Sequence, residues 1–183
     1  MAAHDGILYA CPIGPLADQL GAYFGESAAE CGPNDAHAYP PHVTVTGFFH
    51  DTAPSWPAYA RAVETALEQV GPPPVPAAAV TGLFLHEDFH GLAVASPWLL
   101  AVGIAFAETA PSSTRLDAVR PKTGLHISLA YGFAPAAGPR LSGLATRLVD
   151  PAAEAGWELR LYERAPGNCW LLQGSWPCAT PSG

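Results

Sequence analysis

Two short segments of the same design constrain the fold of this chain more than any other feature. They are His42–Val45, which reads HVTV, and His126–Leu129, which reads HISL. Each has the order histidine, aliphatic, hydroxyl, aliphatic, and is followed by residues that favour strands. Because successive side chains of a strand point to opposite faces, each segment places its histidine and hydroxyl on one face and its aliphatic residues on the other. We therefore expect two strands, each with one face in a core and the other in a cleft.

The sequence around these segments is duplicated as well. Helical spacing of apolar residues predicts helices at 16–30 and 56–70 around the first segment, and at 97–109 and 139–149 around the second. His42 and His126 are 84 residues apart, as are the helix starts that follow them, Ser55 and Pro139. We therefore predict an α+β fold with two pseudo-symmetric lobes of antiparallel sheet, backed by helices around a central cleft. The related strands would face one another across an approximate two-fold axis. Residues 1–183 would form a single bilobal domain.

The charge balance narrows the class of ligand. The chain has 8 basic and 16 acidic residues and a formal net charge of −8. A protein that grips a long nucleic acid neutralises many phosphates, so we expect no such partner. A small anion held by one or two basic groups and by neutral donors fits better. Arg115, Arg120 and Lys122 precede the second segment, and the sequence leaves open whether they contact a phosphate or belong to a solvated loop.

Other features point to an ordinary intracellular enzyme. No apolar run approaches the length that spans a bilayer, and the N-terminus lacks the pattern of a signal peptide. The four cysteines show no CxxC spacing and are expected to be reduced thiols. We therefore expect a soluble, cytoplasmic monomer that has no contact with membranes.

The residue types of the two segments suit displacement at phosphorus. This reaction needs a base for the attacking oxygen and an acid for the leaving oxygen, and histidine can do either near neutral pH. Thr44 and Ser128 can donate hydrogen bonds to the phosphoryl oxygens without a metal. A hydroxyl nucleophile needs a base bonded to its own oxygen. We do not expect that arrangement here, because each hydroxyl lies two residues along a strand from its histidine.

The segments Pro41–Val45 and His126–Leu129 resemble the duplicated signature of the two-histidine (2H) phosphoesterase superfamily. Within that superfamily, Ser128–Gly132 is similar to the cyclic phosphodiesterases of the plant and fungal type. The resemblance implies ring opening of a small cyclic phosphate, such as a 2′,3′-cyclic nucleotide or ADP-ribose 1″,2″-cyclic phosphate, without metal or cofactor. It also implies roles for particular side chains: acid and base for His42 and His126, phosphate ligands for Thr44 and Ser128, and contacts with the substrate for Tyr9 and Tyr131.

Two other functions remain open at this point. His86–His90 matches the HExxH pattern of zinc hydrolases, which requires both histidines one turn apart on a helix. This stretch lies between two β-rich runs, so we expect a hairpin tip with solvated histidines and no metal. A domain of the same fold could instead bind nucleotides or anions without turnover. The sequence indicates no partner for His4, His37 or His50, which are expected to be surface or loop residues.

Overall fold

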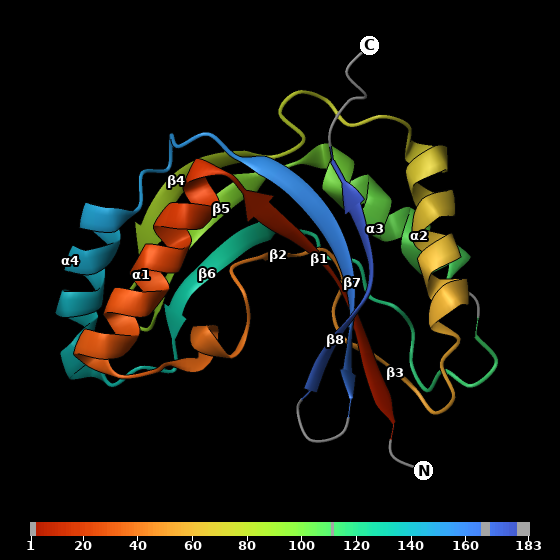
Figure 1. The fold of residues 1–183 in the computed structure, drawn as a ribbon, viewed down its shortest axis with the longest axis horizontal. Helices are drawn as coiled ribbons and strands as arrows, with labels where there is room; N and C mark the ends of the chain where they lie inside the picture. Colours follow the sequence, from red (N-terminus) through yellow and green to blue (C-terminus); the bar gives the residue numbers. More distant parts are fainter. Residues whose placement is uncertain (1–2, 111, 166–168, 179–183) are drawn as a thin grey trace.

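The computed structural model describes residues 3–110, 112–165 and 169–178 and is drawn in Figure 1. Its strands are β1 (His4–Ile13), β2 (Val43–Thr44), β3 (Phe49–Asp51), β4 (Ala79–Leu85), β5 (Phe89–Ala95), β6 (Leu125–Tyr131), β7 (Gly156–Ala165) and β8 (Cys169–Pro177). Its α-helices are α1 (Pro15–Cys31), α2 (Trp56–Val70), α3 (Pro97–Thr109) and α4 (Gly138–Leu148), with short 3₁₀ turns at Asp35–Ala38 and Pro135–Ala137. Within the described residues, no helix is long and apolar enough to cross a membrane.

Local sequence signals set the ends of the helices. Each of the four α-helices has a proline at its first or second position, where the missing N–H costs no helical hydrogen bond. The Ser96 hydroxyl caps α3 by accepting a hydrogen bond from the Leu99 N–H at 3.0 Å. Gly32 and Gly71 end α1 and α2 with positive φ angles of 80° and 83°. The helices therefore begin and end close to the predicted positions.

The strands of the described residues form one antiparallel sheet in the order β4-β5-β6-β2-β1-β7-β8, with β3 beside β1. The chain contains two copies of one β-α-β-α-β unit: β1-α1-β2-α2-β4 and β5-α3-β6-α4-β7. The sheet order makes β2 equivalent to β6, β1 to β5, and β7 to β4. The last strand of each unit pairs with the first strand of the other unit. The two-fold relation predicted from the sequence is thus present, with β2 and β6 side by side at its centre.

The helices follow the same symmetry. Figure 1 shows α1 beside α4 at one end of the sheet and α2 beside α3 at the other, so each pair takes one helix from each unit. All four helices pack against the same face of the sheet, where Leu8, Val43 and Ile127 are fully buried among helix residues such as Leu20 and Phe106. The α+β class is confirmed. The two halves differ from the expectation in sharing one continuous sheet, so the cleft lies on the open face of that sheet.

A buried carboxylate fixes the loop that leads from α3 to β6. Asp51, at the end of β3, is fully buried. It accepts hydrogen bonds from the hydroxyls of Tyr59, Ser112 and Thr114, at 2.9, 2.6 and 2.5 Å, and from the Ala53 N–H at 3.0 Å. Burial alone would raise the pKa of this carboxyl, but the four hydrogen bonds together, led by those from Ser112 and Thr114, outweigh it and hold the pKa below its usual value. Asp51 therefore ties three segments of the chain together.

We expect the Asp51→Ala variant to lose about 3 kcal/mol of unfolding free energy, because it leaves several buried donors without an acceptor. Urea denaturation of the variant beside wild type measures the loss. The Asp51→Asn variant keeps one acceptor oxygen, so its unfolding free energy should lie between those of wild type and Asp51→Ala. A loss within the error of the measurement would show that water or neighbouring groups replace the carboxylate.

Candidate active site

The register of the two central strands brings the predicted residues together. Val43 of β2 pairs with Ile127 of β6 in antiparallel fashion. Continued by one residue in each direction, this register sets His42 opposite Ser128 and Thr44 opposite His126. Residues directly opposite in such a pair have Cβ atoms about 5 Å apart. The two histidines and two hydroxyls therefore form a compact quartet on one face of the sheet, called the cleft face below.

The aliphatic partners of the quartet lie in the core, as predicted. Val43, Val45, Ile127 and Leu129 are each at most 1% exposed and belong to the main hydrophobic core. The burial of these four side chains fixes which face of each strand points outward, because a shift of register by one residue would exchange the faces. The core thus positions the polar quartet.

A β-bulge brings Tyr131 to the cleft face. Gly91 of β5 lies opposite Ser128, whereas the preceding residue of β5, His90, lies opposite Ala130. Leu129 is therefore an extra residue in β6, and the alternation of side chains reverses beyond it. As a result Tyr131 lines the same cavity as Ser128, although strict alternation from Ile127 would place it in the core.

Contacts with Tyr9 and Pro40 hold the His42 imidazole. Its ring stacks on Tyr9, with centroids 3.7 Å apart and planes at 29°. Its Nδ1 lies 2.7 Å from the carbonyl oxygen of Pro40. Since a carbonyl can only accept, Nδ1 carries a hydrogen and Nε2 is left as the reactive nitrogen. The ring of His126 is more exposed and packs edge-on against Phe89, at a centroid distance of 5.4 Å.

One contact differs from the sequence-based expectation. Thr44 Oγ1 lies 3.1 Å from His42 Nε2, within hydrogen-bond distance. The expectation that neither hydroxyl would meet an imidazole is therefore wrong for Thr44, because both side chains lie on the same face of the strand and the long histidine side chain reaches the hydroxyl. Thr44 thus becomes a candidate nucleophile as well as a candidate phosphate ligand, and a comparison of variants separates these two roles.

Both imidazoles are held toward their neutral forms. Burial lowers the pKa of His42 to about 4, the hydrogen bond to Pro40 opposes the shift, and the neighbouring His126 lowers it further. Burial also lowers the pKa of His126, and the Lys122 ammonium adds to the effect. At neutral pH, without an anion bound, both rings are therefore largely uncharged. A bound phosphate would favour protonation of either ring.

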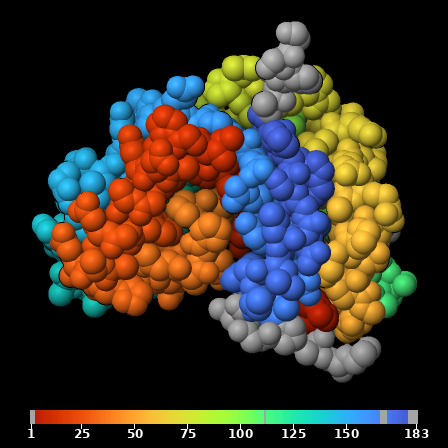
Figure 2. Space-filling model, viewed as in Figure 1, coloured from red at the N-terminus to blue at the C-terminus, as the bar shows by residue number. Residues whose placement is uncertain are grey.

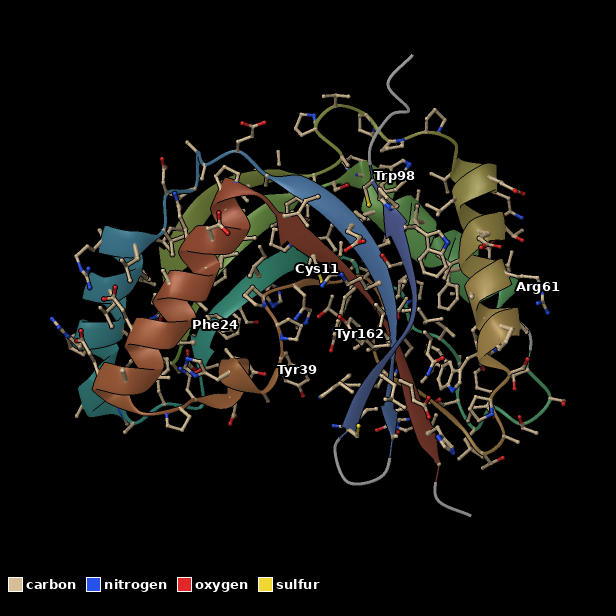
Figure 3. The ribbon with its side chains drawn as sticks, in the orientation of Figure 1. Cys11, Phe24, Tyr39, Arg61, Trp98 and Tyr162 are labelled. Carbon is tan, nitrogen blue, oxygen red and sulfur yellow. The ribbon has the colours of Figure 1, made fainter. Side chains whose placement is uncertain are left out.

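Three members of the quartet, His42, Thr44 and Ser128, line a cavity of about 570 Å³, within the range of small-molecule sites. His126 is exposed and is not among the lining residues. The cavity is lined by Ile7, Tyr9, Phe24, Ala36, Tyr39, Pro40, His42, Thr44, Gly47, Phe48, Arg120, Pro121, Lys122, Ser128 and Tyr131. Figure 3 shows Phe24 on α1 and Tyr39 beyond it on one side of the opening, with Tyr162 on the other. In the space-filling view of Figure 2, α1 and the following segment (red and orange) lie beside the β7–β8 hairpin (blue). None of the described lining residues is acidic, although acidic residues outnumber basic ones two to one in the chain.

The sequence did not indicate most of the aromatic wall. Tyr39, Phe48, Tyr162 and Trp170 pack against Ile7, Tyr9 and Cys11 on the cleft face. The Tyr39 ring meets those of His42 and Trp170 edge-on, at 5.8 and 5.3 Å. These residues come from three distant parts of the chain, so no short motif connects them. The only sequence signal for this wall is the alternation of side chains in β1 and β7. It places Ile7 and Tyr9 on one face of β1, and the pairing of Ile7 with Tyr162 puts Tyr162 on the same face.

The HExxH segment forms a hairpin, as interpreted from the sequence. His86–Asp88 is the turn between β4 and β5, closed by the hydrogen bond from the His86 N–H to the Phe89 carbonyl at 3.0 Å. The two histidines therefore do not share a helix face. His86 is exposed, but His90 is only 1% exposed and packs against Phe133, so the expectation that both would be solvated is wrong for His90. No group of three or more metal-ligating side chains occurs among the residues that the structure describes.

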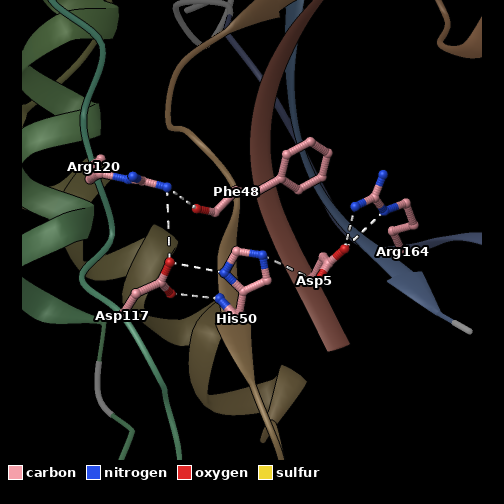
Figure 4. Close-up of polar contacts among 6 residues, drawn as sticks. All are labelled: Asp5, Phe48, His50, Asp117, Arg120 and Arg164. Carbon is pink, nitrogen blue, oxygen red and sulfur yellow. Dashed lines mark hydrogen bonds and ion pairs between the residues drawn. The ribbon is translucent and has the colours of Figure 1, made fainter. Parts of the chain in front are cut away.

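The three histidines for which the sequence indicates no partner all have one. His4 Nδ1 lies 2.5 Å from Glu163, and the His37 ring contacts Ser27 and Asn34. His50 Nδ1 lies 2.9 Å from Asp117, as Figure 4 shows. The contacts of His4 and His50 join segments that only the tertiary fold brings together, whereas the Asn34 N–H donates to His37 Nδ1 within one short 3₁₀ turn and is a local contact. None of these three residues lines the cavity.

No protein family profile matches the chain. Over 163 residues, 87% of its length, the chain is 32% identical to an ecdysteroid-phosphate phosphatase from Bombyx mori. It is 27% identical over 201 residues to the protein of the same name from Drosophila melanogaster, covering 90% of the chain. It is 30% identical over 166 residues to human ubiquitin-associated and SH3 domain-containing protein B, covering 86% of the chain. The chain spans about a quarter of the length of these curated relatives.

Proposed function

We propose that this chain hydrolyses a cyclic phosphodiester in a small nucleotide, such as a 2′,3′-cyclic nucleotide or ADP-ribose 1″,2″-cyclic phosphate, without a metal or another cofactor. The observation that carries the proposal is the quartet of His42, Thr44, His126 and Ser128, which the Val43–Ile127 pairing sets side by side on one face of the sheet. All of the quartet except His126 lines a cavity without acidic lining residues. The resemblance to the two-histidine phosphoesterases rests on the same four positions. Two imidazoles and two hydroxyls supply the acid, base and oxygen ligands that the reaction needs.

The names of the relatives support hydrolysis of a phosphate ester in general. Two of them are called phosphatases of an ecdysteroid phosphate, which is a phosphomonoester. That name describes proteins about four times as long as the matched region. Phosphomonoester hydrolysis is therefore the second candidate function, and the two differ in the bond that breaks.

In the proposed reaction, one imidazole takes a proton from water through its free ring nitrogen. The water oxygen forms a bond to phosphorus, while the bond from phosphorus to one ring oxygen breaks. The second imidazole gives its proton to that departing oxygen, so the product is a phosphomonoester on the same sugar. Thr44 and Ser128 donate hydrogen bonds to the non-bridging oxygens, which gain negative charge in the transition state. The Pro40 carbonyl keeps His42 Nε2 directed at this centre.

The aromatic wall gives the rest of a nucleotide a place to bind. Tyr39, Phe48 and Tyr131 line the cavity next to the quartet. Aromatic faces of this kind stack on nucleobases with little preference for sequence. We infer that the base lies among these rings while the cyclic phosphate meets the quartet.

The lowered pKa values predict an acidic optimum for kcat/KM. The reaction needs one neutral and one protonated imidazole, and this state is most populated between the two pKa values of the coupled pair. Both pKa values lie below 6.5, that of His42 at about 4. We therefore expect kcat/KM to be highest below pH 6.5 and to fall as the pH rises through neutrality, whichever histidine is the acid. A profile with 2′,3′-cyclic AMP measures this, and an optimum above pH 7 would contradict it.

A panel of substrates in excess EDTA tests the proposed function. It contains the four 2′,3′-cyclic nucleotides, ADP-ribose 1″,2″-cyclic phosphate, a steroid phosphate and p-nitrophenyl phosphate. We expect turnover of at least one cyclic phosphate and none of the phosphomonoesters. The reverse pattern would favour a phosphatase, and activity abolished by EDTA would favour a metal site. Binding of cyclic nucleotides without any turnover would indicate a non-catalytic domain.

A further inference from the structure

Two cationic residues extend the polar row of the cleft beyond the quartet. The extended segment 120–122 pairs with residues 45–47, which continue from β2. The Gly47 N–H donates to the Arg120 carbonyl at 2.8 Å, and the Lys122 N–H donates to the Val45 carbonyl at 3.0 Å. The segment therefore prolongs the line of β6 past its first residue. Along this line the polar side chains follow the order Ser128, His126, Lys122, Arg120.

The orientation of this segment is fixed by the residue at its middle. Part of Pro121 borders the cavity, but its Cβ lies toward α3, 3.8 Å from where a Cβ atom added to Gly103 would lie. Since side chains alternate in an extended segment, Arg120 and Lys122 point to the opposite side. Both line the cavity of the quartet. Arg115, the third cation of this loop, instead donates to the Ala110 carbonyl at 2.8 Å and does not line the cavity.

Neither cation is fully engaged by the protein. Among the described residues, Lys122 takes part in no ion pair. The side chain of Arg120 is 68% exposed, and its guanidinium lies 3.9 Å from the Asp117 carboxylate, longer than a charge-assisted hydrogen bond. Figure 4 shows why this contact is weak: the same carboxylate accepts two closer hydrogen bonds, at 2.8 and 2.9 Å, from His50. Arg120 also donates to the Phe48 carbonyl, at 3.3 Å.

The charge of the cavity exceeds what one cyclic phosphate requires. A cyclic phosphodiester carries a single negative charge, and the quartet alone offers it four polar groups. Arg120 and Lys122 add two permanent positive charges, with no acidic residue among the described lining residues to neutralise them. A phosphomonoester carries about 1.5 to 2 negative charges at neutral pH and would match this pair.

We propose that Arg120 and Lys122 form a second anion subsite, which binds a phosphate group of the substrate other than the one that reacts. The inference rests on the proposed function, because it takes the quartet as the site of the cyclic phosphate. It makes the preferred substrate a nucleotide that bears both a cyclic phosphodiester and a further phosphate, such as one at the 5′ position. The two subsites then hold the sugar from both ends, with the base among the aromatic rings between them.

Binding of two product-like ligands tests this subsite without need for turnover. Adenosine 2′-monophosphate and adenosine 2′,5′-bisphosphate differ by one phosphate, and calorimetry gives the affinity of each. We expect wild type to bind the bisphosphate about 10- to 100-fold more tightly, as one or two charge-assisted contacts allow. In Arg120→Gln/Lys122→Gln this ratio should approach one. The single variant Lys122→Gln, which removes no ion pair, should lower the ratio in the same direction even if the double variant folds poorly.

Arg61→Gln is the matched control, since it removes one positive charge from the exposed surface of α2, far from the cavity in Figure 3. It should keep the full ratio. Equal binding of the two ligands by wild type, or an unchanged ratio in the double variant, would overturn the subsite. Preference for the bisphosphate without turnover of any cyclic phosphate would support the subsite and reject the proposed function. Turnover of cyclic phosphates without that preference would support the proposed function and reject the subsite.

Discussion

Replacement of either His42 or His126 by alanine should lower turnover of a cyclic phosphodiester by about 10²- to 10⁴-fold, because each variant lacks one of the two groups that move protons in the transition state. The fold should persist in both. His42 is half-buried and His126 is exposed, so neither imidazole is a main component of the core. The double variant should be about as inactive as the worse single variant, since removal of one proton carrier already disables the pair.

The measurement is the steady-state rate with the best cyclic nucleotide in EDTA, with folding checked by circular dichroism. His86→Ala is the matched control: it removes an exposed imidazole from the β4–β5 turn, outside the cavity. It should retain wild-type activity. Full activity in His42→Ala would refute the mechanism. A large loss in His86→Ala would favour the hypothesis that the HExxH segment binds zinc.

Removal of either cleft hydroxyl should cost about 10²- to 10³-fold in kcat, because a fixed donor to the developing charge on phosphorus is lost. Thr44→Val and Ser128→Ala are the variants that remove the donor with little change of shape. Thr44→Ser, which keeps the hydroxyl, should recover most of the activity. The effect should fall on kcat more than on KM if the hydrogen bond strengthens in the transition state.

Thr81→Val, on the exposed side of β4, serves as the control for a threonine on a strand and should behave as wild type. The size of the effect also decides between the two roles open to Thr44. A loss in Thr44→Val as complete as that of the double histidine variant would make Thr44 a nucleophile activated by His42. A change of less than about threefold would remove Thr44 from the mechanism, since even a modest charge-assisted donor contributes more.

The centre of the fold was predictable from the sequence because its signals are local and repeated. Alternation in His42–Val45 and His126–Leu129 predicted which side chains enter the core, and the burial of Val43 and Ile127 confirms it. The duplicated spacing predicted the two-fold relation, which the pairing of β2 with β6 confirms. Hydrophobic periodicity and turn residues are sufficient for such features, since each depends on a few neighbouring positions.

The remaining features depend on contacts between distant segments. The bulge at Leu129, which turns Tyr131 into the cavity, arises from the pairing of β6 with β5. No residue in the sequence next to Leu129 indicates a bulge. The stacking of His42 on Tyr9 and the partners of His50 require the tertiary fold. Arg120 and Lys122 could be singled out in the sequence, but only the pairing of residues 120–122 with 45–47 shows that they face the cavity.

The product of the reaction shows whether the cleft opens a cyclic phosphodiester. Incubation of 2′,3′-cyclic AMP with the protein in excess EDTA, followed by phosphorus NMR, shows which bond to phosphorus breaks. We predict that the cyclic signal is replaced by that of a single adenosine phosphomonoester, that no inorganic phosphate appears, and that the double histidine variant leaves the substrate intact. Release of inorganic phosphate by the wild-type protein, or conversion by the double variant at the wild-type rate, would contradict it.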